Sequence, residues 1–412
     1  MLKRGPGGLL REHDFRHLWA ADLISQIGTR MSLLAIPLLA LTVLDARPLE
    51  VALLSASERA AALLLGLVVG AWADRLRCRP LLIAADLGRA ALLGSIPAAA
   101  ALDLLTLGQL YVVLFLVGAH TVVFDVAHQT YLPRLVASAD LVEGNAKLAT
   151  NHSIGAVAGA GVGGYLVQWL TAPFVVLLDA LSYLWSALWL RGIRKPEPRP
   201  ERAEQTPLGR EVREGLQYVA RHPILRAITL NSATIMLFQS ANGAIILVFL
   251  VREIGLSPGL IGLLSMVGLL AAIVSSMMTG WIGERIGTAR AMLLGSVITG
   301  AGYLLFPLTT GGAGLVFYVA AGLVTAFGII VLRILEATAI QQICVPAMRG
   351  RVAATIGVAT GAVLPVGAVL GGLLAGSLGL RGTLWLTGVL LLAGSLWLVC
   401  SPLRRLRDIP EP

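Results

Sequence analysis

The stretch Gly70-Ala-Trp-Ala-Asp74-Arg75-Leu-Arg77-Cys78-Arg79 is a short basic loop between two apolar runs. A related stretch, Gly280-Trp-Ile-Gly-Glu284-Arg285, follows 210 positions later and repeats the glycine, the acidic residue and the arginine at the same spacing. In a chain this apolar, a recurring charged pattern is stronger evidence of a repeat than recurring leucines. The two stretches therefore predict a chain made of two related halves.

The repeat extends to both sides of these loops. Pro48 and Pro258 are separated by the same 210 positions. A glycine pattern recurs at an offset of 208, with Gly159, Gly163 and Gly164 matched by Gly367, Gly371 and Gly372. Two halves in the same order along the chain predict the parallel repeat of carriers, in which the substrate site lies between the halves near the middle of the membrane.

Composition places these halves in a membrane. The 412 residues are 57% hydrophobic and 13% charged, with a mean hydropathy of +0.82, whereas about a quarter of an ordinary soluble domain is charged. A helix needs roughly 20 apolar residues to cross a bilayer. Twelve such runs are predicted, near residues 18–41, 51–72, 81–102, 107–127, 148–167, 174–190, 228–250, 260–282, 291–308, 315–335, 352–374 and 383–399.

The basic residues give the orientation. Of the 32 Lys and Arg, 26 fall in segments on one side of the predicted spans and 3 on the other. Because cytoplasmic loops carry the excess of Lys and Arg, we expect both termini in the cytoplasm of a bacterial cell, with the chain in the inner (plasma) membrane. The net charge of +9 is then explained by these loops, and no nucleic-acid partner is expected. No cleavable signal peptide and no disulfide are expected either.

Four regions are predicted: a six-helix bundle at 1–190, a cytoplasmic linker at 191–226, a second six-helix bundle at 227–402 and a cytoplasmic tail at 403–412. The linker begins with an extended Pro-rich piece, Lys195–Pro200. It continues through 208–220 with Leu208, Val212, Leu216 and Val219 at helical spacing. We expect a short amphipathic surface helix there.

These motifs resemble the major facilitator superfamily of transporters. Gly70–Arg79 is similar to its signature loop, and Gly280–Arg285 resembles the degenerate second copy of that loop. The glycine run Gly159–Gly164 is similar to the antiporter motif of exporters in this superfamily. Further stretches resemble the branch of macrolide-efflux and enterobactin-exporter carriers: Phe124-Asp125, Tyr131-Leu132-Pro133, Asn145, Asp86 with Arg89, and Arg349–Val352.

The resemblance implies an all-α membrane protein of twelve transmembrane helices, in two six-helix bundles related by pseudo-two-fold symmetry. It also implies roles for particular residues. A conformational latch is expected from Gly70, Asp74, Arg75, Arg77, Arg79, Asp125, Glu284 and Arg285, with Asp125 pairing with Arg77 or Arg79. A helix-packing motif is expected from Gly159, Ala160, Gly163 and Gly164. The chain departs from the family pattern at Ala160 and Cys78, where the motifs have proline and arginine.

Ionisable residues inside the spans are the candidate functional groups, because each is costly at membrane depth. On the first span Asp22, Gln26 and Thr29 follow one line, and Arg30 flanks it. We expect this polar stripe to face a cavity, with Gln26, Thr29 and Arg30 near the substrate. The alternative, that Arg30 is a structural counter-ion of Asp22, requires a direct pair across about 12 Å of helix axis.

Proton coupling is assigned to Asp22, Glu58 and Arg59. The repeat supports this, because the positions equivalent to Glu58 and Arg59 are Gly268 and Leu269, so the fold does not require charge there. Glu58 is interpreted as a proton acceptor or as one partner of a static salt bridge with Arg30 or Arg59. Two further pairs, Asp86 with Arg89 and Arg333 with Glu336, are interpreted as structural ion pairs on single helices.

In the second half, Asn231, Thr234, Gln239 and Asn242 are predicted to line one arc of a helix and to offer neutral hydrogen bonds to a substrate. A charged stripe in one half and a neutral one in the other suit an amphiphilic solute.

The sequence therefore predicts a proton-coupled exporter of a hydrophobic or amphiphilic small molecule, such as an antibiotic, another drug or a siderophore. An importer, a lipid flippase or a non-transporting sensor of the same fold are the alternatives. An enzyme is not expected, because no HExxH, GxSxG or Walker motif is present. The expected partners are a small molecule, protons and the lipid bilayer. We expect a monomer with no cofactor and no bound metal.

Overall fold

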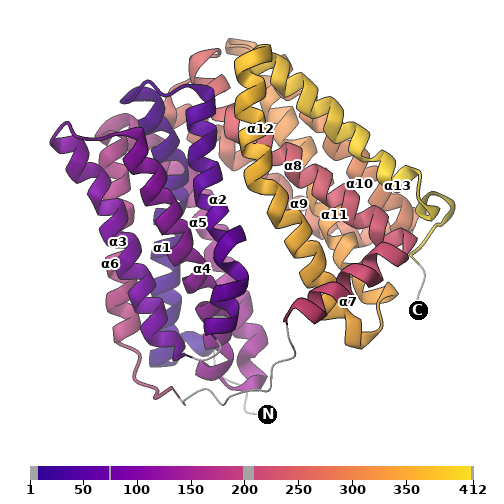
Figure 1. Ribbon diagram of the computed structural model, residues 1–412, viewed down its shortest axis with the longest axis horizontal. Helices are drawn as coiled ribbons and strands as arrows, with labels where there is room; N and C mark the ends of the chain where they lie inside the picture. Colours follow the sequence, from indigo (N-terminus) through magenta and orange to yellow (C-terminus); the bar gives the residue numbers. More distant parts are fainter. Residues whose placement is uncertain (1–7, 74–75, 198–207, 410–412) are drawn as a thin grey trace. The chain divides into compact units, whose positions relative to one another are not determined.

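The computed structural model describes residues 8–73, 76–197 and 208–409 of the chain, almost entirely as helices (Figure 1). Six long helices form the first half: α1 (His13–Thr42), α2 (Pro48–Ala73), α3 (Cys78–Ala101), α4 (Leu107–Leu135), α5 (Leu141–Leu170) and α6 (Ala172–Arg191). The second half contains α7 (Leu208–Arg221), α8 (Pro223–Arg252), α9 (Pro258–Ile286), α10 (Thr288–Tyr303), α11 (Leu315–Ile343), α12 (Pro346–Gly394) and the short α13 (Leu396–Val399).

The twelve predicted spans are confirmed. Ten helices of the described chain are long and apolar enough to cross a membrane, with α12 counted as one. The continuous helix α12 changes direction at Gly379, whose φ of 73° is not helical, and so provides two spans. The 26-residue helix α2 is the twelfth. The predicted ends differ from the observed ends by up to eight residues, as at Leu135 of α4 and Ile343 of α11, because these helices continue past the apolar runs. Helix α10 instead ends at Tyr303, before the predicted end at 308.

The hinge inside α12 has a counterpart in the first half. Thr171, which joins α5 to α6, has φ 80° and ψ 155°, and Gly379 has φ 73° and ψ 168°. The two positions are 208 residues apart, the offset of the glycine repeat. Glycine adopts this conformation without strain, whereas a β-branched residue is strained there. The repeat therefore fixes the backbone at this hinge even where the residue type does not favour it.

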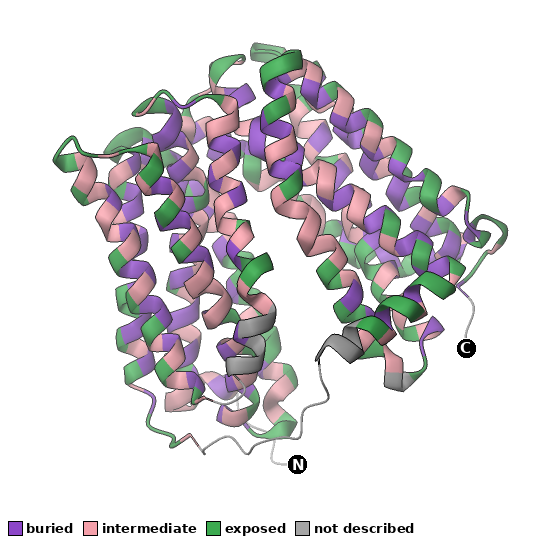
Figure 2. Ribbon diagram, in the orientation of Figure 1, coloured by how far each residue is buried: buried purple, intermediate pink, exposed green. Residues whose placement is uncertain are grey.

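The chain separates into two compact units. The first contains α1, the part of α2 from Ser57 onward, α3 to α6, and Ser257–Leu263 at the start of α9. The second contains Pro48–Ala56 at the start of α2 and the rest of the second half. Most helices bury one side and expose the other (Figure 2). Exposed large apolar side chains, such as Leu188 at 63% and Leu270 at 59%, are typical of helices that face lipid.

In the first unit, α1 packs against α5 and α6. The contact with α5 uses three glycines one turn apart, Gly155, Gly159 and Gly163. A Cβ added at Gly159 would lie 2.8 Å from the carbonyl oxygen of Ile27, and one at Gly163 would lie 3.1 Å from Met31 Cα. Small residues at four-residue spacing allow two membrane helices to approach this closely. The helix-packing prediction for Gly159 and Gly163 thus has a direct geometric basis.

The second unit repeats this contact between α12 and α8. A Cβ at Gly367 would meet the carbonyl oxygen of Leu237, and one at Gly371 would lie 2.8 Å from Ala241 Cα. Leu237 and Ala241 stand 210 positions after Ile27 and Met31 of the first unit. The repeat found in the sequence is therefore a repeat of packing contacts.

The predicted linker helix is present as α7, and it packs on α8 and α12. Its contact face differs from the prediction. Val219 is buried in the core of the second unit, but Leu216 is 58% exposed. Gly215 supplies the close contact instead, because a Cβ there would lie 2.8 Å from the carbonyl oxygen of Arg351. Next to this contact, an ion pair of 2.6 Å between Glu214 and Arg351 joins α7 to α12.

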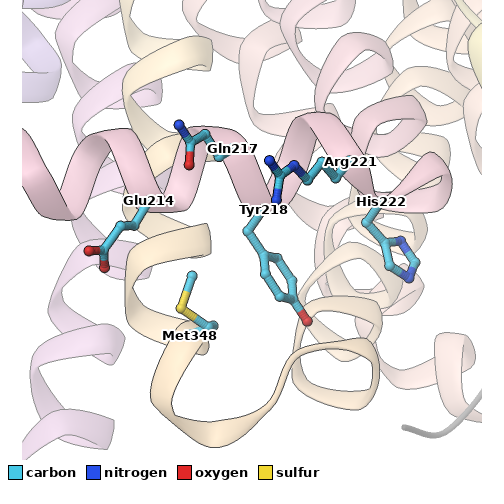
Figure 3. A pocket seen from close by; sticks show the side chains of 6 residues that line it. All are labelled: Glu214, Gln217, Tyr218, Arg221, His222 and Met348. Carbon is cyan, nitrogen blue, oxygen red and sulfur yellow. The ribbon is translucent and has the colours of Figure 1, made fainter.

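A pocket of about 470 Å³ lies beside α7 in the second unit. Figure 3 shows its lining side chains, which are Glu214, Gln217, Tyr218, Arg221, His222 and Met348. Burial lowers the pKa of His222 from its ordinary value, so this imidazole favours the neutral form. Its Nδ1 atom accepts a hydrogen bond from the backbone N–H of Leu225 at 3.4 Å and so caps the start of α8.

Candidate functional site

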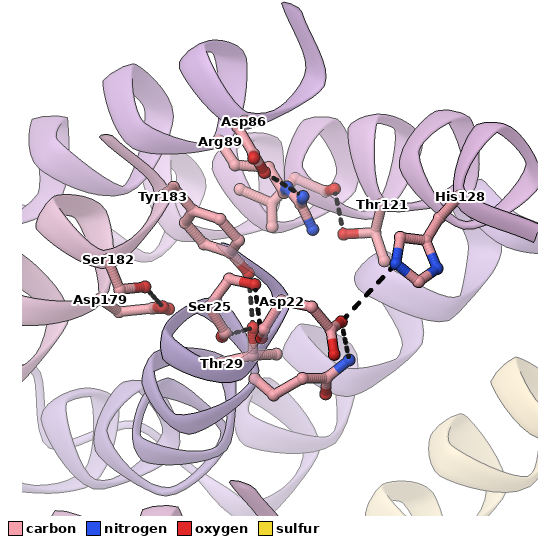
Figure 4. A network of polar contacts seen from close by, with 12 residues as sticks. Asp22, Ser25, Thr29, Asp86, Arg89, Thr121, His128, Asp179, Ser182 and Tyr183 are labelled. Atoms are coloured by element: carbon pink, nitrogen blue, oxygen red, sulfur yellow. Dashed lines mark hydrogen bonds and ion pairs between the residues drawn. The ribbon is translucent and has the colours of Figure 1, made fainter. Parts of the chain in front are cut away.

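The polar stripe of α1 begins at Asp22, which lies inside the first unit and faces His128 of α4 (Figure 4). Asp22 is 4% exposed. Its Oδ2 atom accepts a hydrogen bond from Asn151 Nδ2 of α5 at 2.9 Å, and its Oδ1 atom accepts one from Gln26 at 3.4 Å. The same Oδ1 atom lies 4.0 Å from His128 Nε2 of α4. Asp22 therefore receives donors from its own helix and from α5, and faces an imidazole on α4.

Arg89 of α3 forms a second centre in the same unit. The residue is 4% exposed, and its guanidinium donates to Asp86 one turn earlier. Two aromatic rings enclose the guanidinium carbon, Phe124 at 4.3 Å and Tyr183 at 4.2 Å from the ring centroids. Asp125 of α4 is in electrostatic contact with both Arg89 and Asp22. The predicted pairing of Asp86 with Arg89 is confirmed, and aromatic faces stabilise the buried cation.

The network continues to α6. Tyr183 and Thr29 share a hydrogen bond of 2.7 Å between their hydroxyl groups. Asp179, one turn before Tyr183, accepts a hydrogen bond from Ser182 at 3.2 Å. Thr29 therefore contacts α6, whereas Asp22 and Gln26 contact one another beside α5. The single stripe predicted from helical spacing is divided between two neighbouring helices, because both pack on α1.

Arg30 binds to α5. Its Nη2 atom lies 2.7 Å from His152 Nε2. Its Nε atom is buried, with no hydrogen-bond partner among the described residues. This placement agrees with the argument that Arg30 and Asp22 are too far apart for a direct pair. Its predicted role near the substrate stays a prediction.

Glu58 and Arg59 lie on α2 where that helix packs on α4. Glu58 is half-buried and Arg59 is exposed. The close approach is made possible by Gly118 of α4, since a Cβ there would meet the Glu58 carbonyl oxygen. Among the described residues no ion pair joins Glu58 to Arg30 or to Arg59. Asp179 of α6 is the acid with which Glu58 is in electrostatic contact.

In the second unit, two side chains of the arc predicted on α8 lie inside the packed helices. Asn231 is completely buried and accepts a hydrogen bond from Ser296 of α10 at 2.8 Å. Asn242 is 2% exposed and lies 3.4 Å from the Thr387 hydroxyl of α12. Eleven residues correspond to just over three helical turns, so both asparagines share the face that packs into the unit. Their contact with a substrate stays a prediction.

The other two side chains of the predicted arc are half-buried. The Thr234 hydroxyl accepts a hydrogen bond from Trp397 Nε1 at 3.1 Å, and Gln239 interacts with the Tyr303 hydroxyl. The acid of the second unit also differs from the prediction. Glu336 accepts a hydrogen bond from Ser232 of α8, and Arg333 contacts the sulfur of Met236 at 3.3 Å. Glu336 thus hydrogen-bonds to α8, and Arg333 stays in electrostatic contact with it, but no ion pair joins these two described residues.

The loop after α2 includes Asp74 and Arg75, which lie outside the described residues. Arg79 does not pair with Asp125 as predicted. Its guanidinium donates to the carbonyl oxygens of Leu190 and Arg191 at the end of α6, at 3.0 and 2.5 Å. Both carbonyls lie in the last turn of α6, where the negative end of the helix dipole favours an arginine. In the second half, Arg285 lies over the ring of Trp281 at 5.2 Å.

The carboxylate that binds the start of α3 belongs to Glu197 of the linker. No pattern in the sequence predicts this contact. Glu197 accepts hydrogen bonds from the backbone N–H groups of Cys78 and Arg79 at 2.7 and 3.0 Å, and from Arg134 of α4 at 2.9 Å. Burial of Glu197 opposes its ionisation, but these donors outweigh burial and hold its pKa below the usual range. The linker is therefore fastened to α3 and α4.

Among the residues that the structure describes, no three His, Cys, Asp or Glu side chains come together to hold a metal ion. All three cysteines lie in described segments and are free thiols in this structure.

The chain matches the model of the transmembrane secretion effector family over residues 6–410. It belongs to this family of the major facilitator superfamily. A curated relative, the uncharacterized MFS-type transporter YfiS of Bacillus subtilis strain 168, is 26% identical over 300 residues, which cover 72% of this chain and 69% of the relative. The chain is thus a multi-pass membrane protein of a transporter family, while its assignment to the macrolide-efflux and enterobactin-exporter branch stays a prediction.

Solved structures share the fold. A bacterial homologue of the iron transporter ferroportin in the inward-facing state superposes with a TM-score of 0.78 at 16% identity, covering 95% of this chain and 99% of that one. The nucleoside transporter NupG gives a TM-score of 0.75 at 12% identity, covering 94% of this chain and 98% of that one. At these identities the likeness establishes the major facilitator fold and leaves the substrate open.

Three site residues were not selected from the sequence: Asn151, His152 and His128. Asn151 and His152 lie on α5 beside the glycines that bring α1 close, so their meeting with Asp22 and Arg30 depends on helix packing. His128 could have been found through the repeat. The helices α4 and α11 are both 29 residues long and start 208 positions apart, which makes His128 the equivalent of Glu336.

Proposed function

We propose that this protein is a proton-coupled exporter of a hydrophobic or amphiphilic small molecule, working by alternating access. The observation that carries the proposal is the excess of buried acid in the first unit. Three carboxyl groups of its helices are buried, those of Asp22, Asp86 and Asp179, against one buried arginine, Arg89. With all of these ionised, two negative charges remain uncompensated.

Uncompensated charge in an apolar interior is costly, and proton uptake is the usual way to remove it. A carrier that exposes such a group to the two sides in turn binds the proton on one side and releases it on the other. Asp22 and the imidazole of His128 suit this role as a pair, because the donors to Asp22 come from α1 and α5 while His128 comes from α4. A rearrangement of these helices changes their surroundings directly.

Two findings support export as the direction. The family that the chain belongs to is described as secretion effectors. The glycine run of α5, similar to the antiporter motif, is the surface that packs on α1. An importer, a flippase and a sensor of this fold are the competing functions.

The test uses purified protein in liposomes with an imposed pH gradient and the amphiphilic dye ethidium as the probe. We expect dye movement driven by the gradient and a matching movement of protons. Asp22→Asn is expected to abolish gradient-driven movement while dye binding, measured by fluorescence, survives. Asp103→Asn is the matched control, since this exposed carboxylate lies in the loop after α3 and should have no effect. If the rate of dye movement by the unsubstituted protein is the same with and without the pH gradient, the proposal is refuted.

A further inference from the structure

His128 has an unusual environment in the first unit. Figure 4 shows its ring extending from α4 toward Asp22 of α1. Its Nε2 atom is buried and has no hydrogen-bond partner among the described residues, although Asp22 Oδ1 is 4.0 Å away. The ring stacks on Phe124 with 5.6 Å between centroids and an angle of 16°. The imidazole is therefore held in place by stacking, about one ångström beyond hydrogen-bond distance of a carboxylate.

The second unit contains the same contact in a closed form. Ser232 stands 210 positions after Asp22, and Glu336 stands 208 positions after His128. The Ser232 hydroxyl donates a hydrogen bond directly to the Glu336 carboxylate. The repeat thus places one polar contact between α1 and α4, and its equivalent between α8 and α11. The two side chains are hydrogen-bonded in the second unit, whereas His128 and Asp22 are too far apart for a hydrogen bond in the first.

The open contact joins helices that otherwise touch little. In the first unit α4 packs mainly on α3 and meets α1 only sparsely. An added bond between His128 and Asp22 therefore changes how α4 is held. No equivalent change is available to the permanently charged Arg89, which is already bonded to Asp86 on its own helix.

We infer that His128 is the side chain that takes up the coupling proton, and that its protonation closes the contact with Asp22. This inference rests on the proposed function and names the residue that carries it out. A proton from water adds to the free lone pair of an imidazole nitrogen, giving the imidazolium. The Nε2–H group then donates to Asp22 Oδ1 in a charge-assisted hydrogen bond. Release of the proton to water reverses both steps.

Charged groups from several helices face His128. Asp22 faces it from α1, and Asp86 on α3 and Asp125 on its own helix are in electrostatic contact with it. Arg89 of α3 is the cation among these acids. Beyond Asp22, on α5, His152 is occupied by Arg30. The imidazole is therefore surrounded by three carboxylates and one guanidinium.

A double-mutant cycle tests the inference on the full-length purified chain, with no substrate present. Thermal unfolding midpoints are measured at pH 5.5 and pH 8.5 for the unsubstituted protein, Asp22→Asn, His128→Gln and the double variant. At pH 5.5 we expect the double variant to lose about 2–4 °C less than the sum of the single variants. At pH 8.5 the losses should add. His120→Gln, on the same helix and hydrogen-bonded to the Leu116 carbonyl, replaces His128→Gln in the control cycle and should add at both pH values.

If His128 has only a structural role, the coupling between the two substitutions is the same at pH 5.5 and pH 8.5. If the two residues do not interact, there is no coupling at either pH. Each of these results overturns the inference. If His128→Gln does not fold, His128→Asn takes its place in the cycle. The liposome experiment keeps the two ideas apart. A pH-dependent coupling without proton movement in liposomes refutes the proposed function alone, whereas proton movement with a pH-independent coupling refutes the role of His128 alone.

Discussion

The contact between α1 and α5 predicts a large effect from the smallest possible substitution, Gly159→Ala. The added methyl group would lie 2.8 Å from the Ile27 carbonyl oxygen and against the Cβ of Arg30. Ordinary contacts to a Cβ begin at about 3.4 Å, so the helices must separate by roughly half an ångström or more. The atoms in the way are backbone and Cβ atoms, which cannot move aside by a change of rotamer.

Overpacking of this kind costs about 1–3 kcal/mol. In a unit of roughly 200 residues each kcal/mol lowers the unfolding midpoint by about 2–4 °C. We therefore expect Gly159→Ala to unfold several degrees below the unsubstituted protein in detergent, as measured by intrinsic fluorescence on heating. Gly367→Ala, the equivalent position in the second unit, should behave alike, because its Cβ would meet the Leu237 carbonyl oxygen.

The control is Gly94→Ala on α3, where nothing lies within 4 Å of the added methyl group. It should leave the midpoint unchanged or raise it slightly, since alanine favours the helix over glycine. If Gly159→Ala and Gly94→Ala unfold at the same temperature, the glycines of α5 do not determine this contact, and the packing argument is refuted.

Three further predictions concern the linker, the hinge and the orientation. Glu197→Gln should destabilise the protein by about 1–3 kcal/mol at pH 7 through loss of its three donors. Because folding lowers the pKa of Glu197, its contribution is present at neutral pH and is lost as the pH falls through the lowered pKa of the folded protein; the difference between the two unfolding midpoints should therefore shrink with falling pH, and a difference that stays constant contradicts the linkage. Thr171→Gly should raise the unfolding midpoint, since a strained φ/ψ costs about 1–3 kcal/mol; a lower midpoint argues against strain. Gly311→Cys, between α10 and α11, should react with an impermeant thiol reagent in intact cells, whereas the exposed native Cys400 should react only in everted vesicles; labelling of Cys400 from outside reverses the predicted orientation.

The number of spans and the repeat could be predicted without any structure. Both depend on properties that act locally: about 20 apolar residues are needed to satisfy every backbone group within lipid, and the repeat is read from residue identity alone. The offsets of 208 and 210 residues correctly paired Gly159 with Gly367, because close helix contacts leave space for no other side chain. The pair Asp86 and Arg89 was also predictable, since three residues along a helix place two side chains on one face.

Which polar residues of different helices meet one another became clear only from helix packing. Helical spacing placed Asp22 and Thr29 on one stripe, but α5 binds the first and α6 the second. It placed Asn231 and Asn242 on an arc for substrate, yet that face packs into the unit. Glu197 reached α3 from a linker more than a hundred residues away. The direction that a polar face takes depends on which helices surround it, and neighbours far apart in sequence are fixed by packing rather than by any local pattern.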